Sequence, residues 1–111
     1  MSLEYLRSDD PFTITAKKES PVLVDFSSSS CQPCHLMQPE LEAYALEHPE
    51  IQVICVSADI HPKTTSFFKV RLLPTLILME NGKRIDITIG AQDRNMIARF
   101  VERGLAAVRK P

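Results

Sequence analysis

The twenty residues PVLVDFSSSSCQPCHLMQPE, from Pro21 to Glu40, carry most of the information about the architecture of this chain. They open with a short apolar run, Pro21–Phe26, whose β-branched content predicts a buried strand. From about Pro33 to His48 the apolar residues recur at helical spacing, and the run Ile51–Ser57 predicts a second buried strand. A strand, a helix and a strand in this order form a βαβ unit, whose two strands must be parallel.

The second half of the chain has the pattern of a hairpin followed by a helix. A short helix is expected at Lys63–Lys69, and two strand-like runs, Pro74–Glu80 and Arg84–Ile89, flank Asn81-Gly82-Lys83. Asn-Gly between two such runs is a strong signal for a β-hairpin. The second run alternates apolar and polar residues, as an edge strand with one wet face should. The apolar stripe over Gln92–Val108 predicts an amphipathic helix.

The start of the chain is the least clearly patterned part. A helix is expected over Pro11–Lys18, with Asp9 or Asp10 as its N-cap, although β-branched residues occupy its middle. The complete pattern is a βαβ half followed by a ββα half. It predicts an α/β fold with a central mixed β-sheet and helices on both faces, in a single domain spanning residues 1–111.

Length and composition exclude several classes of protein. The 111 residues include 13 Lys and Arg against 14 Asp and Glu, so no basic surface for nucleic acid is expected. The apolar runs are too short to cross a membrane. No signal peptide is visible, which favours a cytoplasmic location, although a processed periplasmic form would look the same. Three cysteines fit a disulfide-stapled secreted framework badly, and no pattern indicates an oligomer, so a monomer is expected.

Thiol chemistry is expected where the first strand gives way to the long helix. Cys31-Gln32-Pro33-Cys34 lies at this junction, and the positive end of a helix stabilises a thiolate. Cys31, outside the helix proper, is expected to be the attacking nucleophile, and Cys34, in the first turn, the resolving thiol.

Three other interpretations of these cysteines fit the sequence less well than thiol chemistry. They could be two unrelated cysteines, which a strand-to-helix turn disfavours. The run Cys31–His35 matches the C-x-x-C-H of a c-type haem attachment site, but the α/β pattern leaves no helical haem pocket. A zinc site would need further ligands from Cys55, His35, His48 or His61, which show no second paired spacing, so no metal is expected.

In order along the chain, several motifs resemble those of the thioredoxin family: Val22-Leu23-Val24-Asp25-Phe26, Cys31-x-Pro33-Cys34, Pro39, Leu73-Pro74-Thr75, Asn81-Gly82 and Gly90. The resemblance covers the chain from about Pro21 to the last helix. It implies a thiol–disulfide oxidoreductase that needs no cofactor beyond its redox-active Cys31–Cys34 disulfide. Its implied partners are disulfide-containing protein substrates and a reductase such as thioredoxin reductase.

The resemblance also implies roles for individual residues. Asp25 matches a buried carboxylate that takes the proton of Cys34, and burial in an apolar strand should raise its pKa. A strand-end aspartate that caps nearby backbone is the alternative. Pro74 matches a proline that follows a cis peptide bond, where an ordinary strand-opening proline is the alternative, and the backbone of Leu73 would pair with an extended substrate. Gly90 matches a glycine that lets the substrate approach closely, although a simple turn glycine would look the same.

The active-site segment departs from the usual family pattern. Ser30 stands where a tryptophan usually precedes the first cysteine, and Gln32 replaces the usual glycine, so both are expected to contact substrate differently. His35 occupies a position where a basic residue is common, and it is expected to tune the dithiol. Cys55 stands where the family usually has a lysine beside the buried aspartate, so Asp25 is expected to lack a positive partner. Cys55 itself is expected to be a small buried core residue.

These departures keep a second function open. The chain could be a thioredoxin-fold binding module that recognises one dedicated protein through the groove beside Pro74, with little or no turnover. Reductant, oxidant and isomerase also remain alternatives for the enzyme, since a change of 30 mV in reduction potential is only about 1.4 kcal/mol.

Overall fold

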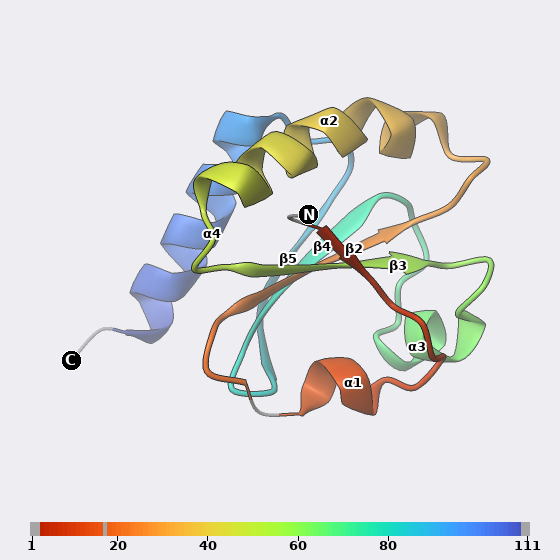
Figure 1. Cartoon of the computed structure of the whole chain (residues 1–111), viewed down its shortest axis with the longest axis horizontal. Coiled ribbons are helices and arrows are strands. Elements are labelled where there is room, and N and C mark those ends of the chain that lie inside the picture. Colours follow the sequence, from red (N-terminus) through yellow and green to blue (C-terminus); the bar gives the residue numbers. More distant parts are fainter. Residues whose placement is uncertain (1–2, 17, 110–111) are drawn as a thin grey trace.

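A mixed β-sheet forms the centre of the molecule, and helices cover both of its faces (Figure 1). The computed structural model describes residues 3–16 and 18–109. Over these residues the sheet has five strands in the order β1-β3-β2-β4-β5. The elements run along the chain as β1 (Leu3–Tyr5), α1 (Phe12–Thr15), β2 (Val22–Ser27), α2 (Gln32–Glu47), β3 (Gln52–Ser57), α3 (Pro62–Phe67), β4 (Thr75–Glu80), β5 (Lys83–Ile89) and α4 (Arg94–Val108).

The strand pairing confirms both halves of the expected fold. β2 and β3 are parallel and are connected through α2, which is the expected βαβ unit. β4 lies antiparallel to β2, with Phe26 opposite Thr75, and β5 lies antiparallel to β4 at the edge of the sheet. The apolar β2 and β4 are central strands, which explains their continuous hydrophobic sequences.

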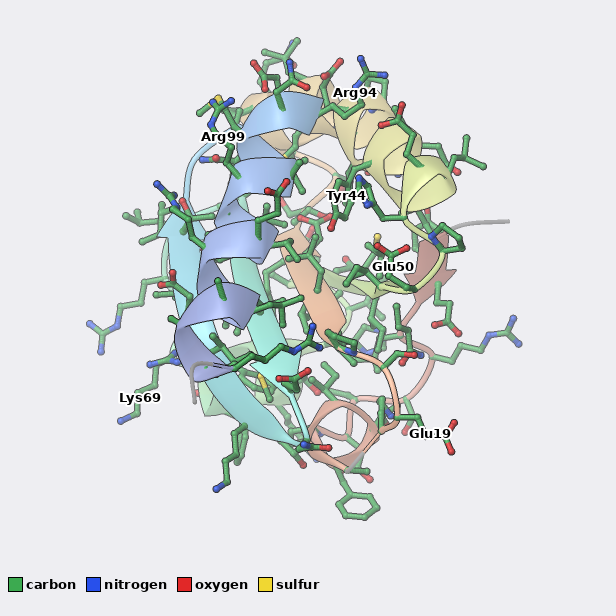
Figure 2. All side chains as sticks on the ribbon, turned by 90° about the vertical axis from the view of Figure 1, so that its left-hand side faces the viewer. Glu19, Tyr44, Glu50, Lys69, Arg94 and Arg99 are labelled. Atoms are coloured by element: carbon green, nitrogen blue, oxygen red, sulfur yellow. A yellow bond between two sulfur atoms is a disulfide. The ribbon has the colours of Figure 1, made fainter. Side chains whose placement is uncertain are left out.

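One face of the sheet is covered by α2 and α4. Met37, Leu41 and Tyr44 of α2 are buried there against the sheet and α4. Figure 2 views this layer from the side, with Tyr44 lying between α2 and α4. The two helices are tied together at the start of α4, where the backbone N–H of Arg94 donates to a carboxylate oxygen of Glu40 over 2.8 Å. Leu36, an apolar residue of the Pro33–His48 stretch that the helical spacing would bury, is instead 65% exposed.

The opposite face is covered by α1 and α3. Ile14 of α1 and Phe68, which follows α3, pack with Val24, Phe26 and Ile77 in a second buried cluster. The rings of Phe26 and Phe68 lie 5.7 Å apart in a tilted arrangement. Because each face of the sheet has its own apolar cluster, the fold has three layers with the sheet in the middle.

The amino-terminal part differs most from the sequence-based expectation. β1, which pairs in parallel with β3, was not predicted because three residues are too few to show a periodic pattern. The expected helix over Pro11–Lys18 is shorter: α1 ends at Thr15, Ala16 is extended and Lys17 lies outside the described residues. The β-branched residues within α1 have low helix propensity, which accounts for its early end.

The two aspartates before Pro11 have different roles. Asp10 accepts a hydrogen bond from the Phe12 N–H at 3.0 Å, so it is the aspartate that caps α1. Asp9 instead accepts hydrogen bonds from the N–H groups of Lys63 and Thr64, at 2.9 and 2.7 Å. Asp9 therefore caps α3, a helix far away in the sequence.

The edge strand β5 has a bulge that the alternating sequence did not reveal. Leu78 pairs with Asp86 and Met79 with Arg84, so Ile85 is the extra residue. Ile85 packs against the core under α4, whereas Ile87 pairs with Ile77, which belongs to the opposite face. The strand lies at the edge as expected, but its isoleucines do not share one buried face.

The hairpin between β4 and β5 turns through Asn81 and Gly82, as the sequence predicts. Both residues have positive φ values, 54° and 76°, which is the backbone of a tight two-residue hairpin turn. Gly82 also lies against α1: a Cβ at this position would collide with the carbonyl oxygen of Thr15. Two independent constraints therefore require glycine here.

We expect Gly82→Ala to lower the free energy of unfolding by about 1–3 kcal/mol, because it adds both a collision and a strained φ angle. Urea unfolding measures the change. The matched control is Asn81→Gly in the same turn, which relieves a positive φ angle and should leave stability close to that of the wild type. Equal unfolding midpoints for Gly82→Ala and the wild type would contradict this assignment.

Candidate functional site

The two cysteines of the C-x-x-C motif lie at the amino-terminal end of α2 and form a disulfide bond. Their Cα atoms are 5.3 Å apart. Cys31 is the N-cap residue, with an extended backbone, and its Sγ accepts a hydrogen bond from the Cys34 N–H at 3.2 Å. Pro33 lies in the first turn of α2, where a backbone N–H has no partner within the helix, so the lack of an N–H on proline costs no hydrogen bond. The local sequence thus starts the helix and places one sulfur at its end.

The surroundings of the disulfide distinguish the two sulfurs. Cys31 is partly exposed, whereas Cys34 is 5% exposed. The first turn of α2 contains no acidic side chain, so the partial positive charge of the helix end is not offset there. A thiolate on Cys31 would be accessible and stabilised by backbone N–H groups.

The loop before the disulfide is polar and well connected. The Ser28 and Ser30 hydroxyl oxygens lie 3.3 Å apart, and Nε2 of His35 lies 2.8 Å from the carbonyl oxygen of Ser29. Ser30 and Gln32, the residues that replace the expected tryptophan and glycine, are both exposed. His35 therefore faces the serine loop, and the rim of the site is hydrophilic.

Asp25 is a carboxylic acid buried inside the sheet. It is 2% exposed and lies in β2 on the face covered by α2, two residues after the core residue Leu23. Burial raises the pKa of Asp25 from 3.8 to about 7, and a hydrogen bond from the Cys55 side chain opposes this shift. Among the described residues no hydrogen-bond partner is found for its Oδ1. The expected raised pKa is thus present, and its cause is desolvation.

Sequence reasoning assigned Cys55 to the core, and the family resemblance placed it at a position that neighbours the buried aspartate. The structure places Cys55 opposite Asp25 in the parallel β2–β3 pair. The register of β2 against β3 confirms that the two residues are neighbours.

Leu73, Pro74 and Gly90 come together at the same end of the sheet as the disulfide loop. The peptide bond between Leu73 and Pro74 is cis, as the resemblance implies. Thr75 pairs with Phe26 near the end of β2, and the Gly90 N–H donates to the Pro74 carbonyl oxygen over 2.9 Å. Gly90 has a φ of 102°, and no atom lies within 4 Å of the place where a Cβ would be. Gly90 is therefore open on this side, whereas Pro74 is buried and Leu73 is half-buried.

The residues weighed as further zinc ligands lie apart. His61 is buried, with Nε2 2.8 Å from the Leu6 carbonyl oxygen, and His48 pairs with Glu50 over 3.2 Å. Within residues 3–16 and 18–109, no group of three or more His, Cys, Asp or Glu side chains is arranged to hold a metal ion. In the same ranges, no helix has the length and apolar character needed to span a membrane.

Comparisons with known proteins agree with the geometry. A family model described as Thioredoxin matches residues 5–103. A thioredoxin from Alicyclobacillus acidocaldarius is 36% identical over 91 residues, 81% of this chain and 87% of the relative. A thioredoxin from Chlamydia trachomatis is 33% identical over 82 residues, 74% of this chain and 80% of the relative. The X-ray structure of Fasciola hepatica thioredoxin has a TM-score of 0.74 and 26% identity, covering 84% of this chain and 86% of that one.

The relatives share the activity that the dithiol predicts, and nothing in these comparisons favours the binding-module alternative. Because the family match extends over most of the chain and includes the Cys31–Cys34 pair, the chain belongs to the thioredoxin family and is a thiol–disulfide oxidoreductase.

Proposed function

We propose that this single-domain oxidoreductase works as a reductant of protein disulfides, with Cys31 as nucleophile, Cys34 as resolving thiol and Asp25 as proton acceptor. The main support is the position of the dithiol: one sulfur is accessible at the positive end of α2, and the other is buried one turn further along. Thioredoxins use no cofactor beyond this redox disulfide, and none is proposed here.

The proposed reaction consists of two thiol–disulfide exchanges. The Cys31 thiolate attacks one sulfur of the substrate disulfide, forms a mixed disulfide and releases the other substrate sulfur as a thiolate. Cys34 then transfers its proton to the Asp25 carboxylate, and its sulfur attacks Sγ of Cys31. The Cys31–Cys34 disulfide forms and the second substrate thiolate leaves. Two electrons have passed from the protein dithiol to the substrate, and protons are taken up by the leaving thiolates.

The substrate is proposed to lie along the backbone at Leu73 and Pro74, beside the open side of Gly90. The backbone of Leu73 would pair with an extended substrate segment, as in other cases of strand addition. Ser30 and Gln32 are exposed next to the disulfide, so the substrate would meet a hydrophilic rim there. His35, held near the Ser29 carbonyl, is proposed to tune the dithiol through its charge when it is protonated.

The oxidised form needs a source of two electrons to complete the cycle. We propose that a reductase, such as a thioredoxin reductase, returns the disulfide to the dithiol. A cytoplasmic location and a monomeric state complete the proposal.

Substituting each cysteine separately should stop turnover in two different ways. Cys31→Ser removes the nucleophile, so insulin reduction should fall to the rate of dithiothreitol alone. Cys34→Ser should also stop turnover but should retain a substrate through Cys31, because the resolving thiol is missing. Mass spectrometry before and after reduction identifies the trapped mixed disulfide. Trapping by Cys31→Ser instead would reverse the assigned roles.

The reduction potential of the dithiol decides the direction of the reaction. We expect a value near −270 mV, typical of a thioredoxin that acts as a general reductant. Equilibration against dithiothreitol buffers, read by alkylation of the free thiols, measures it. A potential near −120 mV would indicate an oxidant and would contradict the proposed direction.

Removing the proton acceptor should slow the second exchange. At pH 7 we expect Asp25→Asn to resolve the mixed disulfide about a hundredfold more slowly than the wild type, the usual size of a general-base contribution. Near pH 8.5 and above the difference should narrow, because an ordinary thiol then ionises without a base. Rapid-quench measurements of the mixed disulfide between pH 6 and 9 test this. Equal rates at every pH would remove Asp25 from the mechanism.

The stability of Asp25→Asn provides a separate test of the burial of Asp25. The pKa of Asp25 is raised to about 7 in the folded protein, against 3.8 for an exposed group, so the folded state holds the proton more tightly. This tighter proton binding adds to the free energy of unfolding below about pH 4, and the addition is lost as the pH rises to about 7. The loss is at most roughly 4 kcal/mol. Asp25→Asn should therefore be more stable than the wild type at pH 8 in urea, and the difference should disappear near pH 4.

A further inference from the structure

Cys55 is the cross-strand neighbour of Asp25. The two residues are directly opposite in the parallel β2–β3 pair. Both face the helical layer formed by α2 and α4, because Cys55 and Leu23 belong to the core cluster on that side. Asp25 and Cys55 are 2% and 5% exposed, so bulk water does not separate them. Their contact is fixed by the sheet itself.

Few other groups can donate a hydrogen bond to the Asp25 carboxyl. Its Oδ1 is buried, and no hydrogen-bond partner for this atom is found among the described residues. From β4, Leu76 is the opposing residue, and its side chain offers no donor. From β3, the opposing residue is Cys55, whose thiol can donate a hydrogen bond. The thiol of Cys55 is thus the side-chain donor that the structure provides for this carboxyl.

Cys55 acts as a neutral donor. Burial raises the pKa of its thiol far above the ordinary value, and the Asp25 charge, the hydrogen bond to Asp25 and the more distant Glu42 raise it further. Cys34, the other titratable residue of α2 near the pair, is held in the disulfide in this structure. The Cys55 thiol can therefore stabilise the carboxylate only as a hydrogen-bond donor, without adding a positive charge.

One cavity borders both Cys55 and the resolving cysteine. The cavity has a volume of about 270 Å³, and Cys34 and Cys55 both line it together with Ser27 and Ser57. Cys55 and the resolving cysteine therefore border one common space.

We propose that Cys55 is a positioning residue for the reaction: its thiol, held across the β2–β3 pair, donates a hydrogen bond that orients the Asp25 carboxylate and stabilises its ionised form. The inference rests on the proposed role of Asp25 as the proton acceptor of Cys34. Cys55 forms no bond with the substrate and exchanges no electrons in this role.

The test follows the titration of Asp25 directly, by NMR of the oxidised protein labelled with ¹³C at aspartate side chains. Cys55→Ala and Cys55→Val both remove the donor, and the valine also fills the space that water could occupy in the alanine variant. We expect both to raise the Asp25 midpoint by roughly half a pH unit to one unit, because an ionised acceptor loses a hydrogen bond. Cys55→Ser keeps a donor and should restore the midpoint to within about 0.3 unit.

Val53→Ala is the matched control, because Val53 lies on the same face of β3 but pairs with Leu23 rather than Asp25. It should reduce stability and leave the Asp25 midpoint unchanged. An unchanged midpoint in both Cys55→Ala and Cys55→Val, an equal shift in Val53→Ala, or no restoration by serine would overturn the inference. The NMR titration needs no turnover, so these outcomes are separate from a failure of Asp25→Asn to slow mixed-disulfide resolution.

Discussion

The parallel contact between β2 and β3 is the constraint on which the site depends. Because the two strands run in the same direction, the chain must cross from the end of one to the start of the other, and α2 makes that crossing. The amino-terminal end of α2 is thereby placed at the end of the sheet where β2 finishes, and Cys31 lies at this point. The same pairing sets Asp25 against Cys55. One strand pair thus places both the reactive sulfur and the buried acid.

The parts of this arrangement that sequence could predict are those with a strong local signal. Buried strands such as β2 form continuous apolar runs, and the hairpin at Gly82 has a turn sequence that few other structures use. The Cys31–Cys34 spacing next to a buried strand indicated the dithiol without any knowledge of the fold. In each case the residues that determine the structure are close together in the chain.

The features that sequence did not reveal depend on contacts between distant segments. β1 is three residues long and gains its order from pairing with β3. The bulge at Ile85 depends on how β5 meets β4, so alternation within β5 alone assigned its isoleucines to the wrong faces. The Asp25–Cys55 contact also joins distant segments, and only the family resemblance indicated it, because two apolar runs do not by themselves reveal their register. Side chains at such contacts can be assigned only after the strands have been aligned.

The cap supplied by Asp9 has a consequence for how the molecule assembles. α3 is a six-residue helix, too short to persist by itself in water. The acceptor for its first free N–H groups is Asp9, which lies 54 positions before Lys63 and 55 before Thr64 in the chain. Closing so long a loop costs conformational entropy before the cap can form. This helix is therefore not a local folding nucleus: it gains its order when the amino-terminal segment docks, so the two opposite halves of the sequence become structured together on that face.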